Sequence, residues 1–378
     1  MQFTFVHTAD WQIGKAFGSL PADKAPLLRE ARLSVIDRIA TLVRAAGARH
    51  VLVAGDVFDS GSVPDRDLIQ SFERLRRHED VGWHFLPGNH DPVRAGGIWE
   101  RVVRLGMPAN VVLHLEVGAS ALCPGVTLLA APLDGKSAAD DPTAYMDRCP
   151  TAPGSHRIGL AHGSVQGFGG QGGEAKVPIA FNRAERAGLS YLALGDWHGV
   201  TRIGGRTWYS GTPEPDRFHE NEPGYALVVR LRSVGDAPVV ERHPTAQFQW
   251  WKRALPLAGP DSLAPLEQAI GQAIERPECF LLRLALEGTA SLRMWSDLEP
   301  RLVALSQRLF HAEISSERVI LRPEAIELDD FGRGDLGEVA RSLSALAADT
   351  ASGDGNIAAL ALRKLHQWHR TTRQEEAA

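Results

Sequence analysis

Five short apolar runs in the first two hundred residues end in the same kind of polar turn. With their turns they read FTFVHTAD, HVLVAGD, WHFLPGNHD, RIGLAH and YLALGD. Short apolar runs bounded by such turns are typical of buried strands. Between the first two runs, Leu33, Ile36, Ile39 and Val43 recur at helical spacing. This alternation predicts an α/β fold in which each strand leads directly into a loop rich in aspartate, asparagine and histidine.

The polar ends of these runs carry donor groups that suit a metal ion. In open α/β sheets, ligands bind outside the carboxyl ends of the strands, so these turns are expected to meet at one edge. Carboxylate, amide and imidazole donors suit divalent first-row metals. One such turn alone is more often a helix cap or a polar loop, but five in succession predict a metal site. The candidate ligands are Asp10, Gln12, Asp56, Asn89, His162, Asp196 and His198.

The order of these turns resembles the pattern of the calcineurin-like metallophosphoesterase superfamily over roughly residues 1–245. The stretches HTADWQIGK, GDVFDSG, LPGNHDP, YLALGDWH and YSGTPEPDRF are similar to the SbcD/YhaO-like group of bacterial DNA repair exonucleases. The resemblance implies an α/β fold of one kind, a metallophosphoesterase β-sandwich flanked by helices.

The resemblance further implies two divalent metal ions bridged by Asp56. It divides the other ligands between the ions as Asp10, Gln12 and His198 on one, and Asn89, His162 and Asp196 on the other. Manganese(II) is the ion expected from the resemblance, and magnesium(II) is the alternative. Two such ions can hold a nucleophile and phosphate oxygens for in-line attack.

Two further residues are expected to take part in the chemistry. The resemblance places His90 where it stabilises the transition state or protonates the leaving oxygen, a usual role for histidine. Asp59, three residues after the bridging aspartate, is expected to orient His90 and keep it protonated. A helix or turn cap is the alternative for Asp59.

Two positions depart from the superfamily pattern, because Gln12 and Asp196 stand where histidine is expected. Glutamine offers a neutral oxygen and aspartate an anionic one, so both replacements are still donors. We favour a rebuilt site with a harder ligand shell. A single weak metal site, or an inactive one, stays open as the alternative.

The chain is expected to divide into three parts. Residues 1–248 would form the metallophosphoesterase (nuclease) domain, and residues 249–346 a small α+β capping domain. Residues 347–378 would form a linker and a C-terminal helix. The resemblance implies that this end docks on a coiled-coil ATPase subunit of the SMC type (SbcC-type), and that the helical segments near residues 66–78 and 97–106 build a homodimer. The alternative for the last helix is packing on its own domain.

Composition and net charge bear on the cellular location and on the binding partners expected for this chain. No apolar run is long enough to span a membrane and no signal peptide is evident, so no membrane association is expected. Three distant cysteines fit a reduced, cytoplasmic location. The net charge of −5 gives no global basic surface for DNA, the expected partner, although bound cations could supply local positive charge.

The sequence therefore predicts an enzyme, a metal-dependent DNA nuclease, expected to be an exonuclease in DNA end processing and repair, with a two-metal mechanism. One alternative is a phosphodiesterase of the same superfamily that acts on nucleotides or other small molecules. A second alternative is a catalytically weak DNA-end-binding or scaffold protein that retains the fold.

Overall fold

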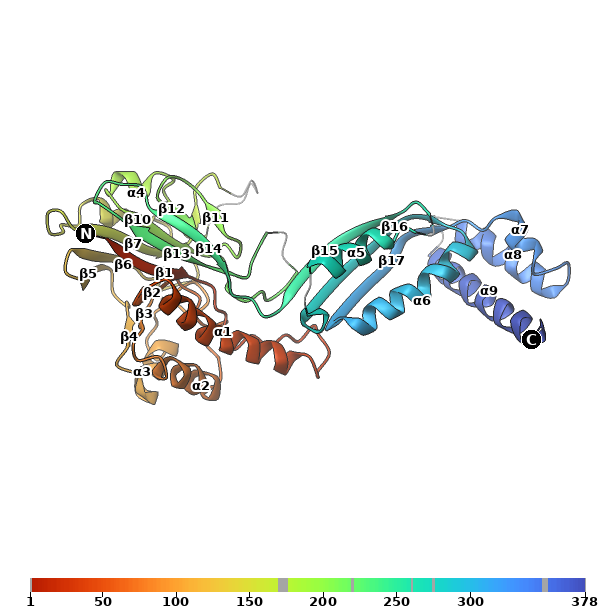
Figure 1. Ribbon diagram of the computed structural model, residues 1–378, viewed down its shortest axis with the longest axis horizontal. Helices are drawn as coiled ribbons and strands as arrows, with labels where there is room; N and C mark the ends of the chain where they lie inside the picture. The colour runs from red at the N-terminus through yellow and green to blue at the C-terminus, as the bar shows by residue number, and fades with distance from the viewer. Residues whose placement is uncertain are drawn as a thin grey trace. The chain divides into compact units, whose positions relative to one another are not determined.

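The computed structural model describes residues 2–168, 176–218, 221–259, 261–273, 276–348 and 353–377. The chain forms two compact units, Met1–Phe248 and Gln249–Ala378 (Figure 1). The division of the chain into three functional parts stays a prediction.

The first unit contains two six-stranded sheets. The first sheet has the order β14-β13-β1-β2-β3-β4, in which β1 to β4 are parallel and β13 and β14 are antiparallel to their neighbours. Its strands are β1 (Phe3–Thr8), β2 (His50–Val53), β3 (Gly82–Phe85), β4 (Val111–Leu113), β13 (Tyr225–Leu231) and β14 (Val239–Pro244). The second sheet has the order β11-β12-β10-β7-β6-β5. Its strands are β5 (Gly118–Cys123), β6 (Val126–Ala131), β7 (His156–His162), β10 (Tyr191–Gly195), β11 (Thr201–Arg202) and β12 (Thr207–Tyr209).

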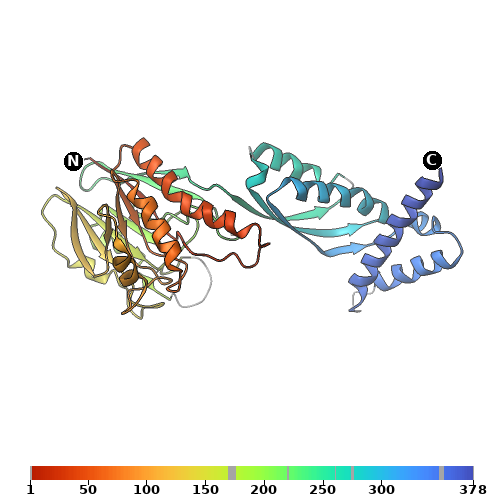
Figure 2. The same cartoon turned by 90° about the horizontal axis from the view of Figure 1, so that it is seen from below.

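The two sheets pack face to face with helices outside them (Figure 2). Phe5 of β1, Leu128 of β6 and Leu160 of β7 belong to the apolar layer between the sheets. Helices α1 (Ala25–Ala45), α2 (Asp65–Arg76) and α3 (Ile98–Gly106) cover the outer face of the first sheet, where they form a separate core. The short helix α4 (Arg183–Arg186) and the 3-10 turn η1 (Ala144–Asp147) pack on the second sheet. The predicted α/β sandwich flanked by helices is thus confirmed.

The carboxyl ends of the central strands from both sheets meet at one place. Parallel pairing puts the ends of β1, β2 and β3 at the same edge of the first sheet. Parallel pairing of β7 with β10 does the same in the second sheet, where His162 lies opposite Gly195. A contact of 2.8 Å between Nδ1 of His162 and the carbonyl oxygen of Ala54 joins the two edges. A two-stranded ribbon, β8 (Ser164–Val165) with β9 (Pro178–Ile179), follows β7.

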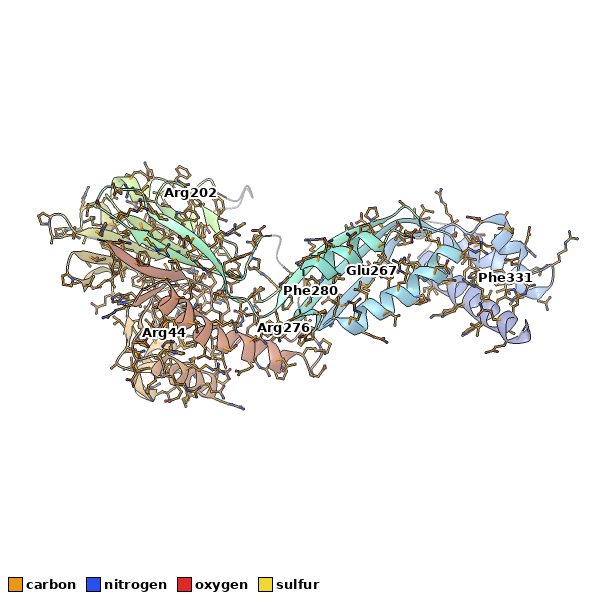
Figure 3. The ribbon with its side chains drawn as sticks, viewed as in Figure 1. Arg44, Arg202, Glu267, Arg276, Phe280 and Phe331 are labelled. Atoms are coloured by element: carbon orange, nitrogen blue, oxygen red, sulfur yellow. The ribbon has the colours of Figure 1, made fainter. Side chains whose placement is uncertain are left out.

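The second unit is a three-stranded parallel sheet with helices. Strands β15 (Gln249–Leu257), β16 (Phe280–Ala290) and β17 (His311–Leu321) pair in that order. Helices α5 (Ala264–Ala273) and α6 (Leu292–Arg308) lie on one face, and Glu267 of α5 pairs with Arg301 of α6 at 2.7 Å (Figure 3). The 3-10 turn η2 (Pro277–Cys279) leads into β16.

The C-terminal part continues this unit with α7 (Ala325–Asp329), α8 (Asp335–Ala348) and α9 (Gly355–Ala377). One side of α9 packs within the unit, since Leu362 belongs to the same apolar cluster as Phe331 and Ala340 of α8. Residues 349–352 of the predicted linker lie outside the described residues. None of the helices in the described ranges is both long enough and apolar enough to cross a membrane.

Candidate metal centre

The turns that carry the candidate ligands have unusual backbone conformations. Asp10, Gln12, Asp56 and Asp196 have φ angles of 53°, 49°, 53° and 99°. Phe17 is the fifth described non-glycine residue with a positive φ. Such conformations are costly for residues with a Cβ and cluster at functional sites. Four of the seven candidate ligands thus lie at strained positions that the surrounding structure must hold in place.

Backbone hydrogen bonds between the first two turns stabilise these strained conformations. The amide of Asp10 donates to the carbonyl oxygen of Gly55, and the amide of Gln12 donates to that of Asp56, both at 3.0 Å. Gly55, at φ +88°, is required here because a Cβ would collide with the imidazole of His162. The two turns therefore come together directly above the ends of β1 and β2.

Asp10, Asp56 and His162 form the tightest group of potential ligands. Each offers one ligand atom, and these atoms lie within 4.8 Å of one another. All three residues are buried. Nδ1 of His162 donates to the carbonyl oxygen of Ala54, so its Nε2 faces Asp56 Oδ1 at 3.6 Å. A metal-binding histidine is usually oriented by such a hydrogen bond from its other ring nitrogen.

The electrostatics of the group show an excess of negative charge in a buried place. Burial raises the pKa of Asp10 to about 6, against the lowering effect of His198 and His162. Burial acts to lower the pKa of His162, but Asp56, Asp10 and Asp196 outweigh it and raise that pKa to about 9. A proton on His162 thus compensates part of the carboxylate charge. A divalent cation would supply this compensation more fully, so the donor set fits such an ion.

Asn89 and Gln12 place amide groups against the same carboxylate. The side-chain oxygen of Asn89 is 3.1 Å from Nε2 of His162, and the opposite amide orientation would put its nitrogen 3.2 Å from both oxygens of Asp56. Gln12 donates from Nε2 to Asp56 Oδ2 at 2.9 Å. An amide can present either end, so each side chain can also turn its oxygen towards a cation beside Asp56.

Asp196 joins the group from the second sheet. Its backbone amide lies 3.2 Å from Asp10 Oδ1, and its Oδ1 lies 3.9 Å from Nε2 of His162. Its other oxygen accepts from the Ser164 hydroxyl at 2.5 Å. Ser164 is a residue that the sequence reasoning missed, because nothing near His162 in the sequence identifies a partner for residue 196.

His198 is oriented by a carboxylate that the sequence reasoning also missed. Nδ1 of His198 lies 3.4 Å from Asp216 Oδ1, and Asp216 Oδ2 pairs with Lys15 at 2.8 Å. Burial lowers the pKa of His198, but the hydrogen bond with Asp216 and the charge of Asp10 raise it overall. Asp216 lies within YSGTPEPDRF, so its stretch was recognised but its part in the site was not.

His90 lies beside the buried group but is half exposed. Its Nε2 is 3.9 Å from Asp56 Oδ2, and its backbone amide donates to Asp56 Oδ1 at 2.9 Å. Its Nδ1 contacts the backbone carbonyl oxygen of Asp59 at 2.8 Å. The side chain of Asp59 points to Lys15 instead, at 3.5 Å. The contact that orients His90 therefore comes from the main chain of Asp59 and not from its expected carboxylate.

Two buried side chains, those of Asp91 and Arg32, form hydrogen bonds that fix the backbone of the ligand-bearing turns. Asp91 accepts from the amides of Gly88 and Phe58, which joins the third turn to the segment after Asp56. Burial and the charge of Asp56 raise the pKa of Asp91 to about 7. Arg32 donates to the carbonyl oxygens of Trp11 and Glu214. The aspartate at the end of GNHD was a usable signal for Asp91, whereas Arg32 gave none.

The sequence of this chain matches the model of a known protein family. The family model described as calcineurin-like phosphoesterase matches residues 3–230. A search of curated proteins finds no individual protein that matches this sequence.

Proposed function

We propose, from the premise that this chain belongs to the calcineurin-like phosphoesterase family, that it is a metal-dependent nuclease that cleaves DNA phosphodiester bonds. The family and the buried group of aspartates and histidine make the chain a metal-dependent hydrolase of phosphoesters. The group of Asp10, Asp56 and His162, held on strained turns, is the observation that carries the proposal. The similarity of five stretches to the SbcD/YhaO-like exonucleases supports DNA as the substrate.

The proposed metal ions would be held by Asp56 and the six other candidate ligands. Divalent ions bound there would supply positive charge for the phosphate oxygens and a nucleophile at neutral pH. Manganese(II) or magnesium(II) fits the oxygen-rich donor set. Burial of Asp10 and Asp56 keeps bulk water from screening their charge, which strengthens their interaction with a cation.

His90 is proposed to deliver a proton to the leaving oxygen. Because its Nδ1 faces a carbonyl oxygen, that nitrogen must carry a hydrogen and donate it. A proton available for transfer is therefore the one on Nε2, present only in the imidazolium form. The exposed position of the ring lets Nε2 face a substrate above Asp56.

The first test is manganese-dependent cleavage of end-labelled single- and double-stranded DNA by the full chain, beside Asp56→Ala. Asp140→Ala is a matched control, since Asp140 is exposed. Cleavage that requires the metal, disappears in Asp56→Ala and persists in Asp140→Ala is the expected result. Products sampled over time would show whether nucleotides leave from an end.

The alternatives predict different outcomes in the same assay. A small-molecule phosphodiesterase would hydrolyse bis(p-nitrophenyl) phosphate with a kcat/KM equal to or above that for DNA. A scaffold protein would bind DNA in both wild type and Asp56→Ala and cleave in neither. Either result would contradict the proposed nuclease activity.

We also propose an ATPase partner with coiled coils and a homodimer. The outer side of α9 leaves Ile357, Leu360 and Trp368 exposed, which supports a docking role for that helix. Helices α2 and α3 expose Ile69 and Val103 in the same way. Light scattering of the full chain, beside Val103→Asp, tests the dimer. Light scattering of the chain mixed with the coiled-coil ATPase, beside Trp368→Asp, tests the docking role. A monomeric wild type would contradict the dimer, and an unaltered complex with the ATPase in Trp368→Asp would contradict the docking role.

A further inference from the structure

Asp196 is a candidate ligand whose two carboxylate oxygens have different partners. Its Oδ2 accepts a hydrogen bond from the Ser164 hydroxyl at 2.5 Å. Its Oδ1 lies 3.9 Å from Nε2 of His162, the ring nitrogen that also lies 3.6 Å from Asp56 Oδ1. One oxygen of Asp196 is therefore directed to the other candidate ligands, while a hydroxyl outside that set engages the second oxygen.

The backbone around this contact is fixed on the side of Asp196. The amide of Asp196 donates to the carboxylate of Asp10, at 3.2 Å from Oδ1 and 3.3 Å from Oδ2. The amide of Gly163 donates to the carbonyl oxygen of Gly195 at 3.2 Å. The residue before Ser164 is thus joined directly to the residue before Asp196, so the two side chains meet across segments that are already connected.

Ser164, at the start of β8, is fixed as well. Its backbone amide donates to the carbonyl oxygen of Val177 at 2.9 Å. The buried hydroxyl of Tyr209 engages both neighbours of Ser164, since it donates to the carbonyl oxygen of Gly163 at 2.7 Å and accepts from the amide of Val165 at 2.9 Å. The Ser164 hydroxyl is therefore a hydrogen-bond donor in a defined position.

The hydrogen bond from Ser164 matters because a carboxylate can bind a cation through one oxygen or through both. Calcium(II) takes carboxylates in either way and tolerates irregular coordination, whereas magnesium(II) demands a near-octahedral arrangement of fewer ligands. Octahedral coordination by oxygen also suits manganese(II). Because the hydroxyl engages Oδ2 and fixes the direction of the carboxylate, Oδ1 is the oxygen that Asp196 presents to a cation.

We propose that Ser164 is a positioning residue that makes Asp196 a ligand with one donor atom, and that it thereby favours manganese(II) over calcium(II) at this centre. The inference rests on the proposed role of Asp196 as a metal ligand. Partners that hydrogen-bond to a ligand commonly set its orientation and tune the metal that it binds. Without the Ser164 hydroxyl, Asp196 is free to turn and offer both oxygens, which the larger ion accommodates more readily.

The test compares the full-length wild type with Ser164→Ala, which removes the hydroxyl, and Ser164→Thr, which keeps it. Ser120→Ala is the matched control, because Ser120 is an exposed serine of β5 in the same unit. Isothermal titration calorimetry at one fixed pH gives the dissociation constants of manganese(II) and of calcium(II). Circular dichroism and the melting temperature in EDTA check that each metal-free variant is folded. Ser164→Cys, with a weaker donor, replaces Ser164→Ala if the alanine variant does not fold.

Ser164→Ala should lower the affinity for manganese(II) about tenfold, the usual size of the effect when a ligand loses its hydrogen-bond partner. The affinity for calcium(II) should fall less, so the ratio of the two affinities should move towards calcium(II). Ser164→Thr should keep both affinities within about twofold of the wild type, because it still carries a hydroxyl donor. Ser120→Ala should change neither affinity.

A second background distinguishes positioning of Asp196 from general support of the loop. In Asp196→His the ligand is an imidazole, which offers one ring nitrogen to a metal and has no second oxygen to release. Adding Ser164→Ala to this variant should therefore leave the ratio of the manganese(II) and calcium(II) affinities unchanged. An equal shift of the ratio in both backgrounds would overturn the proposal.

The outcomes separate this inference from the proposed function. If the wild type binds manganese(II) and Ser164→Ala leaves the ratio of affinities unchanged, the role of Ser164 is refuted and the metal centre stands. If the ratio moves as expected but the wild type cleaves no DNA, the nuclease fails and the role of Ser164 stands. If the wild type binds no divalent ion, the metal centre fails and this inference with it.

Discussion

Three neighbouring histidines, His50 of β2, His84 of β3 and His114 directly after β4, lead to a specific prediction about acid stability. His50 Nδ1 lies 3.1 Å from His84 Nε2, and His84 Nδ1 lies 3.1 Å from His114 Nε2. Each neutral ring offers one N–H and one acceptor, so a run of three neutral rings satisfies both contacts. Burial, followed by the charges of the other two rings, lowers the pKa of His84 from 6.5 to about 3. Burial lowers the pKa of His114 to about 4.

The sign and size of the effect follow from proton linkage. A histidine whose pKa is depressed in the folded state binds more protons when unfolded, so its contribution is complete above pH 6.5 and is lost as the pH falls. Between pH 8 and pH 5, His84 alone should lower the free energy of unfolding by about 2 kcal/mol. His114 should add about the same amount, since both folded pKa values lie below pH 5.

The measurement is hydrogen exchange of the full chain on peptides that cover β2 and β3, at pH 5 and pH 8, corrected for intrinsic exchange. His84→Gln keeps one donor and one acceptor but does not titrate. The fall in the free energy of unfolding between pH 8 and pH 5 should therefore be about 2 kcal/mol smaller in this variant than in the wild type. His243→Gln, on the partly exposed strand β14, is the control and should retain the full loss.

One result would refute this reasoning. A protonated His84 could donate from both nitrogens to two neutral neighbours, and would then hold its charge in the folded state. In that case wild type and His84→Gln would lose equal free energy between pH 8 and pH 5.

Other changes test the metal centre and the second unit. Gly195→Ala would force a Cβ against the carbonyl oxygen of Ala54 and should lower the free energy of unfolding by about 1–3 kcal/mol. The control is Gly205→Ala, where the Cβ would enter open space and should change the free energy of unfolding by less than about 0.5 kcal/mol. Thermal unfolding checks both, and equal melting temperatures would contradict the close packing. Because the pKa of His162 is about 9, manganese binding at pH 7 should displace its proton, and the affinity for manganese should fall about tenfold for each pH unit below 9. Calorimetry in buffers of different ionisation enthalpy measures the number of protons released. Binding at pH 7 without proton release would count against a ligand role for His162. The Glu327 side chain accepts hydrogen bonds from three backbone amides at the starts of α6 and α7. Glu327→Gln should therefore lower the free energy of unfolding of the second unit, measured by hydrogen exchange, by about 1–2 kcal/mol. Unchanged protection from exchange would refute this capping role of Glu327.

The sequence alone was sufficient for the class of fold and for the kinds of donor in the site. Strand and helix periodicities are properties of neighbouring residues, and each apolar run ended in its polar turn within a few positions. The turns at Asp10, Asp56 and Asn89 could therefore be placed at strand ends before any contact between them was known. That they meet at one edge follows from parallel pairing, which is a general property of such sheets.

The partners of these residues depended on the tertiary structure. Asp216 contacts both His198 and Lys15, although Lys15 lies about 200 residues earlier in the sequence, and Arg32 of α1 donates a hydrogen bond to the carbonyl oxygen of Trp11. The carboxylate expected on His90 is replaced by a backbone carbonyl oxygen, because the turn directs the Asp59 side chain to Lys15. No local pattern encodes such a choice.

The same distinction separates the histidines of this protein. His162 was recognisable because its polar turn follows a strand end, a local feature. No local pattern in the sequence connects His50, His84 and His114, which lie about thirty residues apart. Only the order β2-β3-β4 in the sheet brings their rings into contact. The sequence by itself determined the strands, their polar turns and the donor types. The order of the strands and the packing of the two sheets decided which side chains touch, because those contacts join residues that are distant along the chain.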